Sequence, residues 1–432
     1  MTDKYKLPKI PKTWKWAKID DFCEVFSGQT PKGINNFGKD GEIPYFKVAD
    51  MNREGNEKYM RKANIYLTKD EVNKLKIKIY DKGTIIFPKR GGAIATNKKR
   101  ILIKPSAFDL NIMGIKSPIL VEYLYYWISS INLASLSDGS NVPQINNRNI
   151  KPLYVPIPSL NEQKRIVEKI ELIFTNINNS INVLKKVKNN LDIYRKSVLN
   201  YSFKLKEESK KISEYCEIIS GSTPKTSLKE YWGGDILWIT PKDLSGYNNK
   251  YIYKTNRTIT KEGYNSCSTI IIPENNVLMS SRAPIGYLVI NKKPMCTNQG
   301  FKSFKIINHG ELNEEFLFYQ LKHIIEYVKN SGSGTTFNEI SKSKASNILI
   351  KVPDIKIQKQ IVIDIESNFS IIDKLEETIN QLLIKIQLFR ISIMQKAFQG
   401  KLVQQNPLDE SAELLLNRIK NEKHKQMRLY NE

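Results

Sequence analysis

The sequence predicts an α+β protein made of two similar α/β domains, each followed by a long helix. Two stretches carry apolar residues at alternating steps of three and four, which is typical of helices that pair. Short strand-like runs bounded by turn residues precede each of them. The whole pattern occurs twice. We therefore expect the two helices to form an antiparallel coiled coil that relates the two halves by a pseudo-twofold axis.

The first long helix is expected to begin at Ser159. Glu162 follows three residues later, a spacing in which both side chains can satisfy free amides of the first turn. Neither proline nor glycine interrupts the stretch up to Phe203, and some forty residues would make a rod roughly 60 Å long. Ser180 is the polar exception in the apolar seam. Seam positions are Ile166, Ile170, Ile173, Ile177, Leu184 and Leu191, with Val187 and Tyr194 between and beyond them.

The second long helix repeats the first 195 residues later, since Ile166 corresponds to Ile361. Asp354 takes the capping position of Ser159, and Asn368 is the polar residue of this seam. A lone helix of this kind cannot bury its apolar stripe, so we expect the two to pack on each other within the chain. The alternative is two independent helices, each packed on its own domain. Seam positions of the second helix are Ile361, Ile365, Ile372, Leu375, Ile379 and Ile386, with Leu382 and Phe389.

The repeat also covers the globular parts. Ser27-Gly28-Gln29-Thr30-Pro31 corresponds to Ser220-Gly221-Ser222-Thr223-Pro224, 193 residues on. Strand-like runs at 41–47 and 84–87 correspond to runs at 234–240 and 277–279. A shorter helix is predicted near the end of each globular part, at 122–131 and 315–328. One structural unit is therefore used twice.

These patterns divide the chain into five regions. The tail has no counterpart in the first half, and Asp409 is predicted to cap its helix, with Ala412, Leu415, Leu416 and Ile419 on the apolar face. This helix either docks a partner or covers the end of the coiled coil. The predicted regions are the first α/β domain (1–158), the first helix and linker (159–207), the second α/β domain (208–353), the second helix (354–404) and the tail (405–432).

The composition predicts a folded, strongly basic protein. Of 432 residues, 40% are hydrophobic and 10% aromatic, and 68 Lys and Arg face 44 Asp and Glu for a net charge of +24. A folded protein this basic is expected to bind a polyanion, and nucleic acid is the usual one. No stretch of about 18 apolar residues, lipidation motif or secretory signal is present. We therefore expect a cytoplasmic protein without a membrane partner.

The sequence carries no recognised catalytic or metal motif. It lacks a phosphate-binding loop, a dinucleotide fingerprint and the Asn/Asp-Pro-Pro-aromatic stretch of adenine methyltransferases. Glu162-x-Lys164 resembles half of a nuclease motif, but we interpret it as helix capping. The four cysteines and three histidines are too scattered for a metal site, and Cys23 and Cys216 are expected to be buried apolar residues. We therefore predict no catalysis, no cofactor and no metal on this chain.

Loops rich in Lys, Arg, Ser, Thr and Gln recur at equal places in both domains, and such residues contact phosphates and base edges. Arg90 and Arg282 each follow an apolar strand and are the main candidates, while Lys47 and Lys242 are expected to hold phosphate. A structural salt bridge is the alternative for each of these four. The predicted DNA-binding residues are Thr30, Lys32, Lys47, Lys89, Arg90, Ser140 and Gln144 in the first domain, and Thr223, Lys225, Lys242, Ser281, Arg282, Thr335 and Asn338 in the second.

These motifs resemble the specificity subunits of type I restriction-modification systems. The resemblance rests on the paired Ser-Gly-x-Thr-Pro motifs, on the run from Ile157 to Ile166 with its second copy around Pro353, and on the end of the second helix near Gly400. It implies two target recognition domains, two spacer helices, two methyltransferase partners and ATP-dependent restriction subunits. S-adenosylmethionine, ATP and magnesium would belong to those partners. The resemblance also implies that the helix pair docks the methyltransferases.

The sequence thus favours a non-catalytic subunit that reads double-stranded DNA. Two inverted domains with different loops predict an asymmetric target of two short blocks, with centres on the order of one helical turn apart. Two other hypotheses remain open. One is a coiled-coil scaffold or RNA-binding protein, and the other is a self-contained methyltransferase or nuclease with unrecognised motifs.

Overall fold

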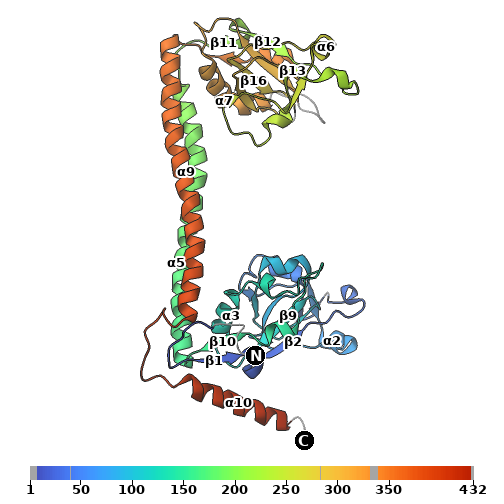
Figure 1. Ribbon diagram of the computed structural model, residues 1–432, viewed down its shortest axis with the longest axis vertical. Helices are drawn as coiled ribbons and strands as arrows, with labels where there is room; N and C mark the ends of the chain where they lie inside the picture. The colour runs from blue at the N-terminus through green and yellow to red at the C-terminus, as the bar shows by residue number, and fades with distance from the viewer. Residues whose placement is uncertain (1–6, 39, 283, 331–338, 430–432) are drawn as a thin grey trace. The chain divides into compact units, whose positions relative to one another are not determined.

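The computed structural model of the chain describes residues 7–429 apart from 39, 283 and 331–338 (Figure 1). It divides into two compact units, Met1–Asn182 with Leu382–Glu432, and Val183–Gln381. Each unit contains one α/β domain together with parts of the two long helices, α5 (Leu160–Ser202) and α9 (Ile355–Phe398). The first unit therefore combines stretches from both ends of the chain.

The first domain contains a five-stranded sheet and a three-stranded sheet. The strand orders are β2-β9-β6-β7-β4 and β5-β3-β8, and β1 pairs with β10 beside them. The central strand β6 is buried along its whole length, so it reads as a continuous apolar run. The elements are β1 (Lys15–Lys18), α1 (Ile19–Phe22), β2 (Glu24–Ser27), β3 (Ile43–Phe46), β4 (Tyr59–Met60), β5 (Ile65–Leu67), α2 (Lys69–Leu75), β6 (Ile85–Pro88), β7 (Arg100–Leu102), β8 (Ala107–Phe108), β9 (Ile112–Lys116), α3 (Val121–Ser129), α4 (Asn147–Ile150) and β10 (Tyr154–Ile157).

The second domain repeats this topology strand for strand. Its five-stranded sheet has the order β12-β19-β16-β17-β14 and its three-stranded sheet the order β15-β13-β18. The predicted repeat of the globular parts is therefore confirmed. The elements are β11 (Lys210–Lys211), β12 (Cys216–Ser220), β13 (Trp232–Ile239), β14 (Tyr251–Ile252), β15 (Arg257–Ile259), α6 (Lys261–Asn265), β16 (Asn276–Ser280), β17 (Leu288–Asn291), β18 (Met295–Thr297), β19 (Phe301–Ile306), α7 (Glu314–Asn330), α8 (Lys342–Ser346) and β20 (Leu349–Ile350).

Both long helices begin where the sequence predicts. The Ser159 hydroxyl accepts a hydrogen bond from the Glu162 amide at 3.1 Å, and the Asp354 carboxylate accepts one from the Lys356 amide at 2.9 Å. The next turn carries a glutamine that is fully buried in both copies. Gln163 accepts from the Leu120 amide, and Gln358 accepts from the Asn313 amide. Each glutamine thereby ties the start of its helix to the turn in front of α3 or α7.

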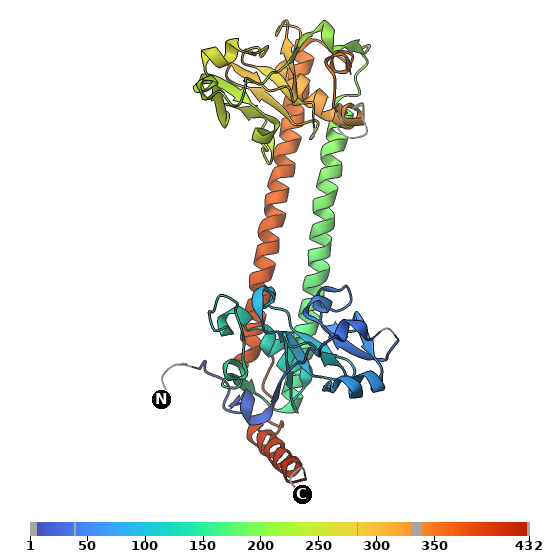
Figure 2. The ribbon, with the colours of Figure 1, turned by 90° about the vertical axis from the view of Figure 1, so that its right-hand side faces the viewer.

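In each unit the two long helices run antiparallel (Figure 2). In the first unit, Arg390 of α9 donates to Asn178 of α5. In the second, Lys188 donates to Asn380 at 2.9 Å and Arg195 pairs with Asp373 at 2.6 Å. The start of one helix thus meets the end of the other, as the antiparallel prediction requires.

The predicted seam is only partly buried. Leu375 is 47% exposed, so its assignment to the seam is wrong, and Val187, Tyr194, Leu382 and Phe389 are also exposed. An α-helix drifts by about 20° per heptad relative to a strict seven-residue repeat, so a four-three list leaves the contact line over several heptads. Ile166, Ile170, Ile177, Leu191, Ile365, Ile372 and Ile379 are buried, whereas Ile173, Leu184, Ile361 and Ile386 are half-buried.

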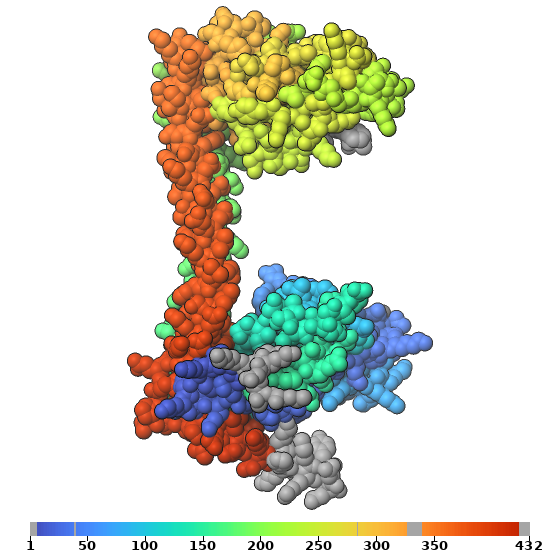
Figure 3. Space-filling model, viewed as in Figure 1, coloured from blue at the N-terminus to red at the C-terminus, as the bar shows by residue number. Residues whose placement is uncertain are grey.

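The tail forms α10 (Ala412–Leu429), which packs on the N-terminal part of the first unit (Figure 3). Ser411 caps this helix, because its hydroxyl accepts from the Leu414 amide. The predicted cap Asp409 is wrong, since its carboxylate instead pairs with Arg165 at 2.7 Å. The Glu162 carboxylate accepts from the Trp14 indole at 2.9 Å and from Gln405. Trp14 and Gln405, which are far apart in the sequence, therefore both contact the start of α5.

Cys23, Cys216 and Cys296 are buried, and no disulfide forms among the described residues, as predicted for the first two. Among the described residues, no helix is long and apolar enough to cross a membrane. The same residues contain no group of three or more His, Cys, Asp and Glu side chains placed to hold a metal ion.

Candidate nucleic-acid interface

Three loops of the first domain meet at one edge of its five-stranded sheet. Strands β2 and β6 both pair antiparallel with β9, so their carboxyl ends lie beside the start of β9. The Thr30 hydroxyl accepts from the Leu110 amide at 3.0 Å, and the Lys89 amide donates to the Asn111 carbonyl at 2.8 Å. Residues 109–111 thus join the loop after β2 to the loop after β6.

The basic side chains of this edge are placed differently. The Lys89 ammonium donates to Ser27 at 2.9 Å, and burial followed by the neighbouring charge of Arg90 lowers its pKa. Arg90 forms a backbone bridge with Gln144 and is exposed, and no ion pair to it is found among the described residues. Ser140 donates to Asp138 at 2.8 Å within the loop that ends at Gln144. Lys89, Arg90, Ser140 and Gln144 therefore form one surface.

Lys47 reaches the same region from the three-stranded sheet. The Asp109 amide donates to the Phe46 carbonyl at 2.9 Å, which places Lys47 near the junction of the loops. Its ammonium donates to Asn35, and its charge lowers the pKa of Asp109, although burial raises that pKa overall. Lys32 is exposed on the loop that carries Thr30. The seven predicted residues of the first domain thus come from three loops that meet and from the position directly after strand β3.

The Ser-Gly-x-Thr-Pro motif has a packing reason in both domains. A Cβ on Gly28 would lie 2.1 Å from the Asp109 carbonyl oxygen, and one on Gly221 would lie 2.2 Å from that of Asn298. Under each loop a buried aromatic side chain donates to the backbone. Tyr45 donates to the Gln29 carbonyl at 2.7 Å, and Trp238 donates to the Ser222 carbonyl at 3.0 Å. The motif therefore lets its loop pack closely on the residues that precede β9 in the first domain and β19 in the second.

The second domain brings its loops together in the same way. Strands β12 and β16 pair antiparallel with β19, and the Ser281 amide donates to the Gly300 carbonyl at 2.7 Å. The Thr223 hydroxyl donates to the Gln299 side chain. The Asn298 amide donates to the Ile239 carbonyl at 3.0 Å, and Lys242 follows shortly after in an exposed position. Thr223 and Ser281 therefore adjoin residues 298–300, and Lys242 follows the strand β13 that joins them.

An ion-pair cluster distinguishes the second domain. The Arg282 guanidinium pairs with Glu339 at 2.8 Å, and Lys302 lies 3.6 Å from the same carboxylate. The salt-bridge alternative is therefore observed for Arg282. Lys302 is buried, which lowers its pKa, while the charge of Glu339 opposes that shift. Two cations thus share one anion at the loop surface.

The remaining predicted residues of the second domain are Ser281, Lys225, Thr335 and Asn338. Ser281 is fully buried and lies 3.4 Å from the Lys302 ammonium, so this placement does not support a direct DNA contact by its side chain. Lys225 is exposed on the loop after β12. Thr335 and Asn338 lie outside the described residues.

Sequence reasoning missed Lys302, Glu339, Gln299 and Asn111. Lys302 stands in β19 between Phe301 and Ser303, and Lys305 lies in the same strand, so the local sequence does not mark Lys302 as buried. Glu339 and Asn111 are brought to the site only by long-range pairing, and no local pattern marks them. The loop opposite Thr223 could have been found by aligning Asn298-Gln299-Gly300 with residues 109–111.

Two like α/β domains, each with a polar loop surface and a long helix, define a specificity protein with two recognition domains. Residues 11–189 and 205–385 each match the type I restriction modification DNA specificity domain. The chain therefore belongs to that family.

The relatives agree with this assignment. The chain is 41% identical over 181 residues to the MjaIX specificity subunit of Methanocaldococcus jannaschii, a match that spans 41% of each protein. It is 25% identical to the MjaVIII specificity subunit of the same organism, over 91% of this chain and 94% of that protein. A solved structure from work on complex assembly and conformational transition of the type I R-M system has the same fold, with a TM-score of 0.71 at 18% identity, covering 91% of this chain and 99% of that one.

Proposed function

We propose that this chain reads an asymmetric, two-part DNA sequence for a type I restriction-modification complex and performs no catalysis itself. Each recognition domain would read one block through the loops at the edge of its five-stranded sheet. The observation that carries the proposal is the repeated convergence of these loops, with Lys89 and Arg90 in the first domain and Arg282 and Lys302 in the second. Their unlike side chains would make the two blocks differ.

The helix pair would set the gap between the blocks and dock two methyltransferase subunits. Its outer surface supports such docking, because Ile384, Leu388 and Ile391 of α9 are more than half exposed at a spacing that places them on one helix face. Restriction subunits would join in the full complex. S-adenosylmethionine, ATP and magnesium would bind to the partners, and the complex would act in the cytoplasm.

A selection from random duplexes by the full-length chain tests the proposal. We expect two separated sequence blocks with a fixed gap, and binding that weakens with salt at a log–log slope of about −0.9 per neutralised phosphate. Inserting one heptad into α5 and one into α9 at the same level would lengthen the pair by about 10 Å. At 3.4 Å per base pair this should widen the gap by about three base pairs and leave both blocks unchanged.

Three outcomes would contradict the proposal. They are binding that does not depend on salt, a single continuous block, and structured RNA that competes better than the selected duplex. Methyl transfer or DNA cleavage by the isolated chain would favour the enzyme hypothesis instead.

A further inference from the structure

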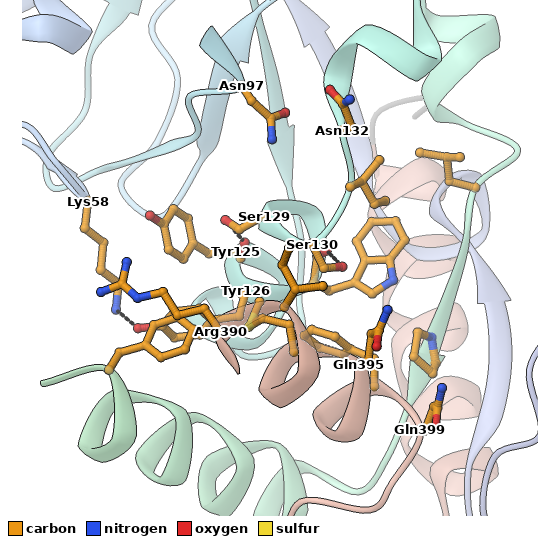
Figure 4. Close-up of a pocket in the computed structure, with 18 of the residues that line it drawn as sticks. Lys58, Asn97, Tyr125, Tyr126, Ser129, Ser130, Asn132, Arg390, Gln395 and Gln399 are labelled. Carbon is orange, nitrogen blue, oxygen red and sulfur yellow. Dashed lines mark hydrogen bonds between the residues drawn. The ribbon is translucent and has the colours of Figure 1, made fainter. Parts of the chain in front are cut away.

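A lysine in each domain connects that domain to its own long helix. In the first unit the Lys58 ammonium lies 2.6 Å from the Glu171 carboxylate of α5 and 3.3 Å from the Tyr126 hydroxyl of α3. Lys58 immediately precedes β4, the edge strand of the five-stranded sheet. A single charge thus touches the sheet edge, the short helix and the long helix. Figure 4 shows Lys58 and Tyr126 beside Arg390.

The contact continues to the other long helix. The Tyr126 ring meets the Phe174 ring of α5 edge to face, with centroids 6.0 Å apart. The Arg390 guanidinium of α9 lies over the same Phe174 ring at 5.2 Å. We call Lys58, Tyr126, Glu171, Phe174 and Arg390 the first junction. It links the recognition domain to α5 and then to α9 within one unit.

The second unit contains the same five residue types at the repeat-equivalent positions. Tyr319 and Phe369 meet edge to face at 5.9 Å, and the Arg195 guanidinium lies over Phe369 at 5.5 Å. Lys250 pairs with Glu366, and the Tyr319 hydroxyl donates to Glu366 at 3.3 Å. The second junction is Lys250, Tyr319, Glu366, Phe369 and Arg195.

The two lysines are held as cations in half-buried places. The side chain of Lys58 is 22% exposed and that of Lys250 is 14% exposed. Burial alone would lower their pKa, but the hydrogen bonds to Glu171 and Glu366 raise the pKa of each above its ordinary value. Tyrosine rings at 4.6 to 5.5 Å add cation–π attraction. A solvated surface pair would not need such an enclosure, and it would not fix the geometry of three elements.

The junctions differ in their ion pairs. Lys250 also pairs with Glu315 of α7 at 3.1 Å, whereas Glu171 is the carboxylate partner found for Lys58 within the described part of the chain. Arg195 pairs with Asp373 at 2.6 Å and with Glu376 at 2.8 Å, whereas Arg390 donates to the neutral Asn178, and its Nε is buried without a hydrogen-bond partner. Arg390 and Lys58 also line a cavity of about 1400 Å³ between α3 and the two long helices (Figure 4). The first junction is therefore less braced than the second.

We propose that the two junctions fix the orientation of each recognition domain on the helix pair and thereby determine which gap lengths the protein accepts. Lys58 and Lys250 are positioning residues in this role, since their partners Glu171 and Glu366 belong to the long helices and they act through the orientation of the domain. The inference rests on the proposed function, in which the helices separate two half-sites. A domain that can turn on its helix would reach half-sites at more than one distance.

The test is the gap distribution that the full-length chain selects from random duplexes. Lys58→Met should leave both blocks unchanged but broaden the gap, so that sites one base pair longer or shorter bind within threefold of the best site. Lys250→Met should do the same. The charge exchange Lys58→Glu with Glu171→Lys should restore the narrow gap, and Lys151→Met, which breaks a surface pair with Asp20 in the same domain, should not change it.

Thermal melting distinguishes a variant that fails to fold from one that folds and accepts a wider range of gaps. Should Lys58→Met fail to fold by thermal melting, Tyr126→Phe removes only the hydroxyl and should broaden the gap to a smaller extent. A Lys58→Met protein that folds and keeps the wild-type gap, or that weakens at all gaps equally, overturns the inference and leaves the proposed function standing. A wild-type chain that selects no two-block site overturns both.

Discussion

The two recognition domains share their supporting structure and differ at their loop surfaces. Both have the same strand order, a glycine that packs on the backbone of a neighbouring loop, and a buried glutamine at the start of the long helix. At the surface, the register places Lys302 of the second domain where the first has Met113, and Ser281 follows the strand where Lys89 does. Arg90 is exposed and Arg282 is paired. The comparison teaches that the repeat preserves what positions the loops and varies what they present.

The largest effect on stability and binding is expected from substitutions of the glycine that packs on the neighbouring loop in each domain. Gly28→Ala would place a Cβ 2.1 Å from a backbone oxygen, and we expect it to destabilise the first unit by about 4 kcal/mol and to remove only the first block from the selected site. Gly221→Ala should remove only the second block. Urea unfolding and duplex selection measure the two effects.

Gly92→Ala serves as the control for these variants, because no atom lies within 4 Å of the added Cβ. Loss of both blocks from either variant would contradict the independence of the two domains.

The next effect concerns Lys99 of the first domain, a buried lysine that the second domain does not repeat at the equivalent position. Lys99 donates to Asn97 at 2.6 Å and to the Ile131 carbonyl at 2.7 Å, and burial lowers its pKa to about 8. Leu288 takes the corresponding place in the second sheet. Because the unfolded pKa is about 10.4, the folded state disfavours the proton that the unfolded state keeps. The free energy of unfolding should therefore rise between pH 8 and pH 10.4, by up to about 3 kcal/mol.

Lys99→Leu should abolish this rise. Urea unfolding of both proteins at several pH values measures it, since the other titrating groups cancel in the difference. A difference that stays constant between pH 7 and pH 10 would mean that Lys99 titrates normally.

The two loop arginines should differ in their contribution to binding. Arg90→Ala should weaken binding by about 2 kcal/mol and relax the first block only, which is typical of a lost base contact. Arg282→Ala should cost less, because Arg282 must leave Glu339 before it can contact DNA, and such exposed pairs are worth up to about 1 kcal/mol. Dissociation constants for duplexes with either block altered would show this. Equal losses for the two variants would argue against a role for Glu339.

The smallest effect is expected from Glu339→Gln. Removing the anion between Arg282 and Lys302 should make the salt dependence steeper by the equivalent of about one phosphate, a slope change of about −0.9. Glu217→Gln is the matched control, since Glu217 pairs with Lys305 at 2.9 Å in the same domain. An unchanged slope for Glu339→Gln would remove this residue from the interface.

The sequence predicts the elements of the fold better than the contacts between them. The long helices could be placed because capping and the apolar period are local signals. The buried strand around Phe87 is apolar throughout, and the one around Leu278 is apolar at its three central residues. Seam residues such as Leu375 were placed wrongly because the contact of two helices depends on their actual pitch and crossing. Lys58 and Lys250 look like ordinary turn lysines in the sequence, and only the packing of three elements reveals their partners.

The interface shows the same limit. The repeated Ser-Gly-x-Thr-Pro motifs indicate that Thr30 and Thr223 lie in equivalent loops, and the structure gives the motif its packing reason. Arg282 is paired because Glu339, which is far away in the sequence, lies beside it in the fold. No local sequence pattern could predict this pair.

The first unit takes its core from both ends of the chain, whereas the second is one continuous stretch. Met394, Ala397 and Phe398 belong to the same hydrophobic cluster as Tyr123 and Ile166. A premature stop codon just after Gln381 would therefore damage the domain translated first and spare the one translated last. A frameshift late in the gene should therefore abolish DNA recognition by the N-terminal domain.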